Sequence, residues 1–118
     1  MKIGHIEVFV GDVKESLAFY NGILGFEVTA VQGDRHAWIK SGEIEILLRS
    51  DHKPERKRVS GYDKAICGIV LYTDDLEAEM EALRMRGLEF RGNDGSDNCP
   101  TFHDPDGNWF QLVNPEEH

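Results

Sequence analysis

The sequence predicts an α+β fold made of two copies of a strand–helix–three-strand (βαβββ) module. Alternating apolar residues open each half of the chain, an apolar helical stripe follows, and short strand-like segments come after each stripe. We expect one domain over residues 1–118, with a first module at about 1–50, a linker at 51–64 and a second module at about 65–118. Each helix would cover one face of its sheet and leave the other face available.

The first module opens with alternation over residues 3–10, which predicts a strand. Asp12 stands three residues before Glu15 and predicts a helix start, and Gly25 predicts the helix end. The apolar stripe between them consists of Val13, Leu17, Tyr20 and Leu24. Three short strands are expected at residues 26–31, 36–40 and 43–48.

The second module repeats this order. A strand is expected at residues 66–73, and Leu76, Met80 and Leu83 mark a helix face that ends at Gly87. Strands are then expected at residues 88–91, 100–103 and 108–113. The linker at 51–64 is polar and partly basic, which is typical of a solvated connector, although a basic loop of this kind can also hold an anion.

Two registers relate the modules. The helix ends, Asp12 with Asp74 and Gly25 with Gly87, give an offset of 62 residues, whereas the apolar stripes give 63. A stripe must face the core, while a cap can shift by one residue, so we favour 63 for the strand and the first helical turns. His5 then corresponds to Gly68 rather than to Cys67, and the distinction matters because a one-residue slip reverses the sheet face.

Composition limits the possible partners. The formal net charge of -9 argues against nucleic-acid binding, which needs a basic surface. Cys67 and Cys99 form no CxxC motif and are typical of reduced thiols. No signal peptide and no membrane-spanning apolar run is visible, so we expect a soluble cytoplasmic protein with no membrane partner.

Three segments together resemble the vicinal oxygen chelate (VOC) superfamily, which includes glyoxalase I, bleomycin-resistance proteins, fosfomycin-resistance enzymes and extradiol dioxygenases. The segments are His5-Ile6-Glu7-Val8, Ser16-Leu17-Ala18-Phe19-Tyr20 with Leu24-Gly25-Phe26, and Asp104-Pro105-Asp106-Gly107-Asn108. The resemblance covers essentially the whole chain. It implies paired βαβββ modules that form a cup-shaped mixed sheet, the glyoxalase/bleomycin-resistance/dioxygenase fold, in a homodimer.

The resemblance also implies metal-ligand positions on the first and last strands of the modules. In this chain they hold His5, Glu45, Gly68 and Gln111. Gly68 has no donor side chain, and Gln111 offers a neutral amide where the resemblance implies a glutamate. A divalent ion such as Zn, Ni, Mn or Fe would therefore have only His5, Glu45 and Gln111, with one anionic ligand among them. We expect no cofactor, with such a metal left open as the alternative.

Strand alternation predicts a binding face as well. Glu7 shares the face of His5, Glu43 shares that of Glu45, and Trp109 shares that of Gln111. Thr101 and His103 share a face near the rim, and the resemblance points Trp38 inward. The predicted ligand-binding residues are His5, Glu7, Trp38, Glu43, Thr101, His103 and Trp109. Core or dimer packing remains the alternative for the tryptophans, and a solvated strand edge for the glutamates.

Aromatic faces beside carboxylates favour a flat or cationic organic ligand. The leading hypothesis is a glyoxalase- and bleomycin-resistance-like protein that binds a small organic molecule without a complete metal site. One alternative is a metal-dependent lyase, isomerase or thiol transferase of the same superfamily, in which Glu45 or His103 would supply acid–base help. Another is a dimeric interaction domain without a ligand.

Overall fold

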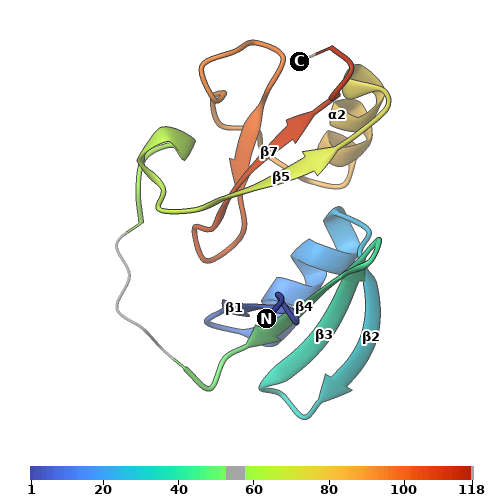
Figure 1. The fold of residues 1–118 in the computed structure, drawn as a ribbon, viewed down its shortest axis with the longest axis vertical. Coiled ribbons are helices and arrows are strands. Elements are labelled where there is room, and N and C mark those ends of the chain that lie inside the picture. Colours follow the sequence, from blue (N-terminus) through green and yellow to red (C-terminus); the bar gives the residue numbers. More distant parts are fainter. Residues whose placement is uncertain (53–57, 118) are drawn as a thin grey trace. The chain divides into compact units, whose positions relative to one another are not determined.

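The computed structural model describes residues 1–52 and 58–117, which fall into two compact units, Met1–Arg56 and Lys57–His118 (Figure 1). We call them unit 1 and unit 2. Residues 53–57 of the predicted linker lie outside the described residues. At the end of the same linker, Tyr62–Lys64 form a short 3₁₀ helix, η2. The single domain over residues 1–118 stays a prediction. No helix in the described parts of the chain is long and apolar enough to cross a membrane.

Unit 1 is a four-stranded mixed sheet with one helical segment. Its elements are β1 (Ile6–Phe9), α1 (Val13–Leu17), η1 (Ala18–Ile23), β2 (Glu27–Gln32), β3 (His36–Ser41) and β4 (Ile44–Arg49). The strand order is β1-β4-β3-β2, with β1 parallel to β4 and the other pairs antiparallel. All four strands and the helix predicted for the first module are therefore present.

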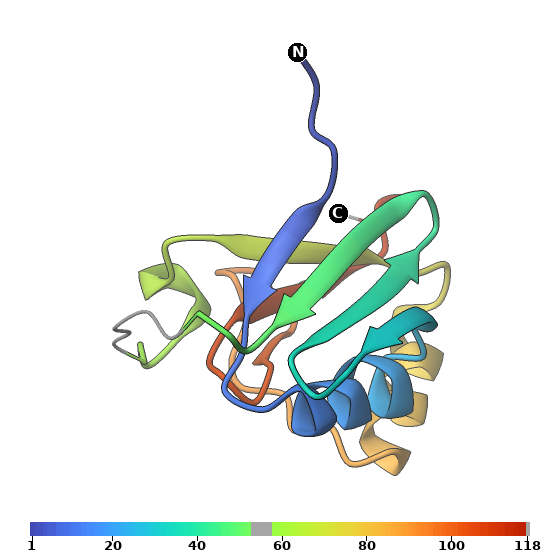
Figure 2. The ribbon, with the colours of Figure 1, turned by 90° about the horizontal axis from the view of Figure 1, so that it is seen from below.

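One face of this sheet forms the core of unit 1. Val8, Ala37 and Leu48 lie in one row across β1, β3 and β4 and are all buried. Helix α1 packs against β3 and β4, and Figure 2 shows the helical segment along one face of the sheet. The apolar residues that face the helix thus hold the strands in register, and the opposite face is left to the polar side chains between them.

The helices explain why the two modules gave two offsets. The capping residues are Asp12 and Asp75, which are 63 residues apart, so the predicted match of Asp12 with Asp74 is wrong. The glycines that follow the helices, Gly25 and Gly87, both have positive φ and are 62 residues apart. Segment η1 is a π-helix, whose wider turn accommodates one extra residue. The register of 63 is therefore confirmed for the helix starts.

Unit 2 has a three-stranded mixed sheet. Its elements after η2 are β5 (Gly68–Tyr72), α2 (Leu76–Met85), β6 (Thr101–His103) and β7 (Trp109–Val113). The strand order is β5-β7-β6, with β5 parallel and β6 antiparallel to β7. The α+β class with mixed sheets is thus confirmed in both units.

The prediction of a strand at residues 88–91 is wrong, because no strand forms in the described segment between α2 and β6. This segment runs beside β6, where the Arg91 amide donates to the Thr101 carbonyl at 2.7 Å, but only an isolated bridge between Asn93 and Pro100 forms. Gly92 has a φ of 74°, a left-handed conformation that interrupts an extended strand. The loss of regular pairing therefore follows from the backbone at Gly92, which apolar alternation does not report.

The turn between β6 and β7 is organised by Asp104, which is 1% exposed. Its Oδ1 accepts from the backbone amides of Asp106 and Asn108 at 2.9 and 2.8 Å, and its Oδ2 accepts from Asn108 Nδ2 at 2.7 Å. Arg58 donates to the Pro105 carbonyl on the same turn. These contacts fix the turn that brings β6 and β7 side by side.

Candidate functional site

The sheet face of unit 1 opposite α1 carries charged and polar side chains among apolar ones. Strand register places Glu7, Leu47 and Trp38 in one row on this face, and Arg49 with His36 in another row two residues along. Because side chains alternate along a strand, both rows point away from the buried row that faces the helix. We call this surface the polar face of unit 1.

Three of the predicted binding residues meet on the polar face. The His5 ring lies edge-on to Trp38, with ring centroids 4.8 Å apart. His5 Nε2 lies 3.1 Å from Glu7 Oε2. His5 precedes β1 in the chain, and its position beside Trp38 and Glu7 follows from the parallel pairing of β1 with β4. The predicted proximity of these three residues is thus seen within unit 1.

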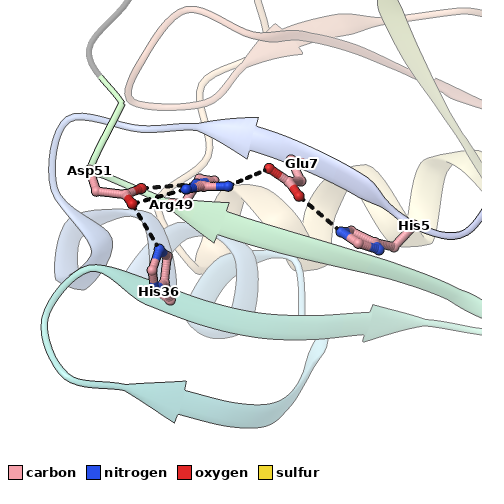
Figure 3. A network of polar contacts seen from close by, with 5 residues as sticks. All are labelled: His5, Glu7, His36, Arg49 and Asp51. Carbon is pink, nitrogen blue, oxygen red and sulfur yellow. Dashed lines mark hydrogen bonds and ion pairs between the residues drawn. The ribbon is translucent and has the colours of Figure 1, made fainter.

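The same Glu7 begins a chain of ionic contacts across the polar face (Figure 3). Arg49 Nη1 donates to Glu7 Oε1 at 2.8 Å, while Arg49 Nε and Nη2 both donate to Asp51 at 2.9 Å. His36 Nε2 lies 3.2 Å from Asp51 Oδ2. Arg49 therefore bridges two carboxylates, and each carboxylate also contacts a histidine.

These contacts favour the charged forms of the three central groups. Hydrogen bonds from Arg49 and then His5 lower the pKa of Glu7. The Arg49 guanidinium likewise lowers the pKa of Asp51, with a smaller effect from His36. Hydrogen bonds to Asp51 and Glu7 raise the pKa of Arg49. The arrangement stabilises a negative–positive–negative row along the strands, which orients Glu7 beside His5.

We expect the Arg49→Met variant to have a weaker dependence of stability on acid pH. The folded pKa values of Glu7 and Asp51 lie below their ordinary values of 4.5 and 3.8, so the stability they contribute is present above those values and is lost as pH falls. Urea unfolding of unit 1 between about pH 6 and 3, followed by Trp38 fluorescence in a Trp109→Phe background, would measure the slope. Lys14→Met, which removes an exposed cation from α1 of the same unit, is the control. Equal slopes in all three proteins would contradict the expectation.

Sequence reasoning did not place Arg49, Asp51 or His36 in a candidate site. Alternation does place Arg49 on the face of Glu45 and Leu47, so that part of the signal was present. Its contact with Glu7, 42 positions away, depends on the parallel pairing of the two strands, which no local pattern reports.

The two other predicted glutamates of unit 1 are exposed. Glu45 is paired with Lys40 and precedes Ile46, the partner of Ile6, so it lies toward the end of the sheet near His5. Glu43 lies in the turn before β4 rather than within the strand that was predicted from residue 43. Their roles in metal or ligand binding stay predictions.

In unit 2, strand pairing places the remaining predicted residues on one sheet face. Gly68, Trp109 and His103 form one row, and Gln111 pairs with Thr101 in the next row on the same face. The shared face of Gly68 and Gln111 agrees with the predicted register. Trp109 is buried, and its ring centroid lies 5.1 Å from that of His103.

Two of these side chains are engaged by the backbone. His103 Nδ1 lies 2.7 Å from the Asp104 carbonyl, a contact in which the ring nitrogen must donate. Nε2 therefore carries the lone pair when the ring is neutral. Thr101 is buried, and its hydroxyl donates to the Arg91 carbonyl at 2.6 Å. Thr101 thus ties β6 to the neighbouring segment.

Tyr62 connects the two positions that depart from the metal-ligand pattern. Gln111 Nε2 donates to the Tyr62 hydroxyl at 2.9 Å. The tyrosine ring lies over Gly68, where an added Cβ would be 2.5 Å from Tyr62 Cζ. A side chain at position 68 and the present position of Tyr62 are therefore mutually exclusive. Sequence reasoning missed Tyr62 because it lies in the polar connector, where no periodicity marks it.

A cavity of about 320 Å³ opens on this face of unit 2. We call it the Gln111 cavity, and the described residues that line it are Val70, Tyr72, Asp94, Gln111, Val113 and Pro115. The Gln111 Oε1 atom is buried and has no hydrogen-bond partner among the described residues. A buried amide oxygen without a partner costs about 1–3 kcal/mol, so a small movement of the Gln111 side chain that brings this acceptor to a donor in the cavity would be favoured.

A second cavity, of about 430 Å³, lies in unit 1 and is lined by Asp34, Arg35, Ser50 and Asp51. Its lining is polar, and Asp51 is already held by two side-chain contacts to Arg49. It therefore offers less apolar contact to an organic molecule than the Gln111 cavity does.

The donors within either unit do not fit a divalent ion. His5 Nε2 contacts Glu7, Gln111 Nε2 donates to Tyr62, and Gly68 has no donor side chain. Within residues 1–52 and 58–117, no three His, Cys, Asp or Glu side chains gather in a group that could hold a metal ion. A stable site for a first-row metal needs three or four imidazole, thiolate or carboxylate ligands.

Comparison with known proteins agrees with the fold described above. A model of the Glyoxalase/Bleomycin resistance protein/Dioxygenase superfamily matches residues 2–112. No curated protein matches the chain. Among solved structures, the chain is similar to TnmS3, an antibiotic binding protein from Streptomyces sp. CB03234. The identity is 27%, over 97% of this chain and 98% of that one, with a TM-score of 0.69.

Two more distant structures share the fold. Lactoylglutathione lyase from Agrobacterium tumefaciens is 16% identical over 98% of this chain and 95% of its own, with a TM-score of 0.72. The fosfomycin resistance protein FosX from Listeria monocytogenes, solved as a mutant with Mn(II), is 16% identical over 95% of this chain and 88% of its own, also at 0.72. At these identities the likeness concerns the fold alone.

Proposed function

Because this chain belongs to the glyoxalase/bleomycin resistance protein/dioxygenase superfamily, we propose that it binds a small organic molecule in the Gln111 cavity without a complete metal site. The observation that carries the proposal is the cavity itself. Its volume of about 320 Å³ is within the range of small-molecule sites, and its wall combines apolar side chains with an amide whose buried oxygen has no partner among residues 1–52 and 58–117. TnmS3, at 27% identity, is an antibiotic binding protein, which supports the same class of function.

The wall of the cavity favours binding over chemistry. Val70, Val113 and Pro115 supply apolar surface, Tyr72 adds an aromatic ring, and Asp94 and Gln111 supply a carboxylate and an amide. Of the described residues that line the cavity, none offers the imidazole, thiol or amine typical of nucleophilic or general-base catalysis at neutral pH. His103 lies on the same sheet face but does not line the cavity.

The other predicted contacts remain part of the proposal. We assign ligand contact in unit 1 to the surface of His5, Glu7 and Trp38, where an indole lies beside a carboxylate. Such a surface suits a flat or cationic group through stacking and charge pairing. The homodimer implied by the resemblance stays a prediction.

Filling the cavity tests the proposal. We expect Val70→Trp to weaken binding of aromatic compounds at least tenfold, because Val70 lines the cavity while being 45% exposed, so the larger ring can enter the cavity without opening the core. Compounds would be chosen by a ligand-observed NMR screen, and dissociation constants would be measured by calorimetry. Met85→Trp, an exposed position on α2 outside the cavity wall, is the matched control.

Two outcomes would contradict the proposal. One is a screen in which no compound shifts the resonances of the cavity residues. The other is near-stoichiometric Zn, Ni, Mn or Fe in protein purified without chelator or metal-affinity resin, lost in His5→Ala. The second result would favour the metal-dependent lyase, isomerase or transferase alternative instead.

A further inference from the structure

The Gln111 cavity has a charge pattern that distinguishes between ligand classes. Its described lining includes one carboxylate, Asp94, and no lysine, arginine or histidine. Asp94 forms no ion pair with any described residue, in contrast to Glu7 and Asp51 of unit 1, which both pair with Arg49. A half-buried carboxylate that pairs with no cation in the described part of the chain attracts a cation from solution.

Asp94 is held in place by its loop. Its backbone amide donates to the Cys99 carbonyl at 3.1 Å, and its Oδ1 accepts from the Ser96 amide at 3.1 Å. The nearby Cys99 thiol is buried, and burial followed by the charge of Asp94 raises the pKa of that thiol. The carboxylate is therefore positioned before any ligand arrives, which lowers the entropy cost of binding.

Two further groups of the wall select the same kind of ligand. Gln111 contributes an amide whose Nε2 donates one hydrogen to Tyr62 and whose Oε1, an acceptor, is buried and has no partner among the described residues. Tyr72 is 74% exposed and lies two residues from Val70 on the same face of β5, so its ring is available to contact a ligand. A carboxylate, an amide oxygen and an aromatic ring all interact favourably with an ammonium group.

Other ligand classes match this wall less well. An anion would meet the Asp94 carboxylate, and the described lining residues supply no cation to compensate. A divalent metal would find one carboxylate and one amide, too few ligands for a hard ion. A neutral aromatic molecule would fill the apolar part but leave Asp94 desolvated and unpaired, which costs free energy.

We propose that the Gln111 cavity takes an organic cation, a primary or secondary ammonium group carried on a compact apolar body. Asp94 pairs with the ammonium, Tyr72 covers it, and the amide of Gln111 lies in the wall beside it. Val70, Val113 and Pro115 contact the body, for which the cavity has room for about ten groups of the size of a water molecule. This inference rests on the proposed binding function and adds the chemical class of the ligand.

A matched pair of compounds tests the inference. 1-Naphthylmethylamine, protonated at pH 7, and 1-naphthylmethanol have the same size and differ in charge. We expect the amine to bind wild-type protein about tenfold more tightly than the alcohol, since it gains a charge-assisted hydrogen bond and a cation–π contact. In Asp94→Asn the amine should lose most of this preference, whereas the alcohol, which no longer buries an unpaired carboxylate, should bind at least as tightly as it does to wild type. Asp97→Asn, an exposed carboxylate of the same loop, should leave the ratio unchanged.

The outcomes separate the two proposals. If the alcohol binds as tightly as the amine, the cavity binds organic molecules and the cation inference is wrong. If the preference for the amine persists in Asp94→Asn, the carboxylate does not carry it and the inference is also wrong. If neither compound shifts the backbone NMR resonances of Val70, Tyr72 or Gln111, both the inference and the proposed binding function fail together.

Discussion

Replacing Asp104 with alanine is expected to reduce the free energy of unfolding of unit 2 by about 3–5 kcal/mol. The carboxylate is almost fully buried and accepts hydrogen bonds from Asp106 N, Asn108 N and Asn108 Nδ2. Alanine removes all three acceptor contacts at once and leaves the donors of the turn without their partner. Each such loss in a buried site costs more than the net value of the bond itself.

The structural change caused by Asp104→Ala should be largest in the strands that carry the candidate site. Asp104 directly follows β6, and Asn108 directly precedes β7, so the turn determines how Thr101 and His103 pair with Gln111 and Trp109. We therefore expect Asp104→Ala to weaken ligand binding in the Gln111 cavity even at temperatures where unit 2 remains folded. Resonances of β7 residues should shift more than those of α2.

Each unit contains one tryptophan, and this makes the measurement specific. In a Trp38→Phe background, Trp109 reports the unfolding of unit 2 in urea. Asp104→Asn should lose less, about 1–2 kcal/mol, because its side-chain carbonyl still accepts the two backbone amides. Asp97→Ala, in an exposed loop of the same unit, is the control and should change little. A loss in Asp104→Ala no larger than that of the control would contradict the role of the turn.

The same turn illustrates what local patterns predict well. Pro105 and Gly107 mark a turn by composition alone, and Asp12 marks a helix start, because both signals depend on backbone conformations near the residue itself. The strands of unit 1 followed from alternation for the same reason. Burial of Asp104 and its three hydrogen bonds were not predicted, since they depend on how the strands on either side pack.

Local backbone geometry and contacts between distant segments explain most of what was missed. The π-helix η1 reconciles the two module offsets, yet an extra residue inside a helix leaves no mark on the apolar stripe. Arg49 joins Glu7 only because β1 and β4 pair in parallel, a register that no alternation contains. Trp109 shares the predicted face but is buried, so parity gives the side of a sheet and not its exposure.

Tyr62 is the clearest case of a contact that the sequence patterns did not predict. Gly68 and Gln111 were each interpreted as a departure from a metal-ligand pattern, one by loss of the side chain and one by loss of the charge. In the structure, both residues contact the same tyrosine. The small residue makes room for the ring, and the amide donates to its hydroxyl. The two departures are therefore parts of a single packing arrangement, which provides a direct test.

Gly68→Ala is expected to destabilise unit 2 by about 1–3 kcal/mol, because the new Cβ would overlap Tyr62 and force the ring away from its position. Moving the ring also breaks its hydrogen bond with Gln111 and leaves the whole amide without a protein partner. The cavity wall then changes along with stability, so binding of aromatic compounds should weaken as well. Urea unfolding followed by Trp109 in the Trp38→Phe background would measure the first effect.

A double-mutant cycle identifies the cause. Tyr62→Ala removes the ring, so adding Gly68→Ala to it should cost only a few tenths of a kcal/mol, and the coupling between the two positions should account for most of the single-mutant loss. Gly4→Ala is the matched control, since no heavy atom lies within 4 Å of an added Cβ there. If Gly68→Ala were equally harmful with and without Tyr62, its effect would come from the strand backbone. The glycine at position 68 would then have to be explained separately from the glutamine at position 111.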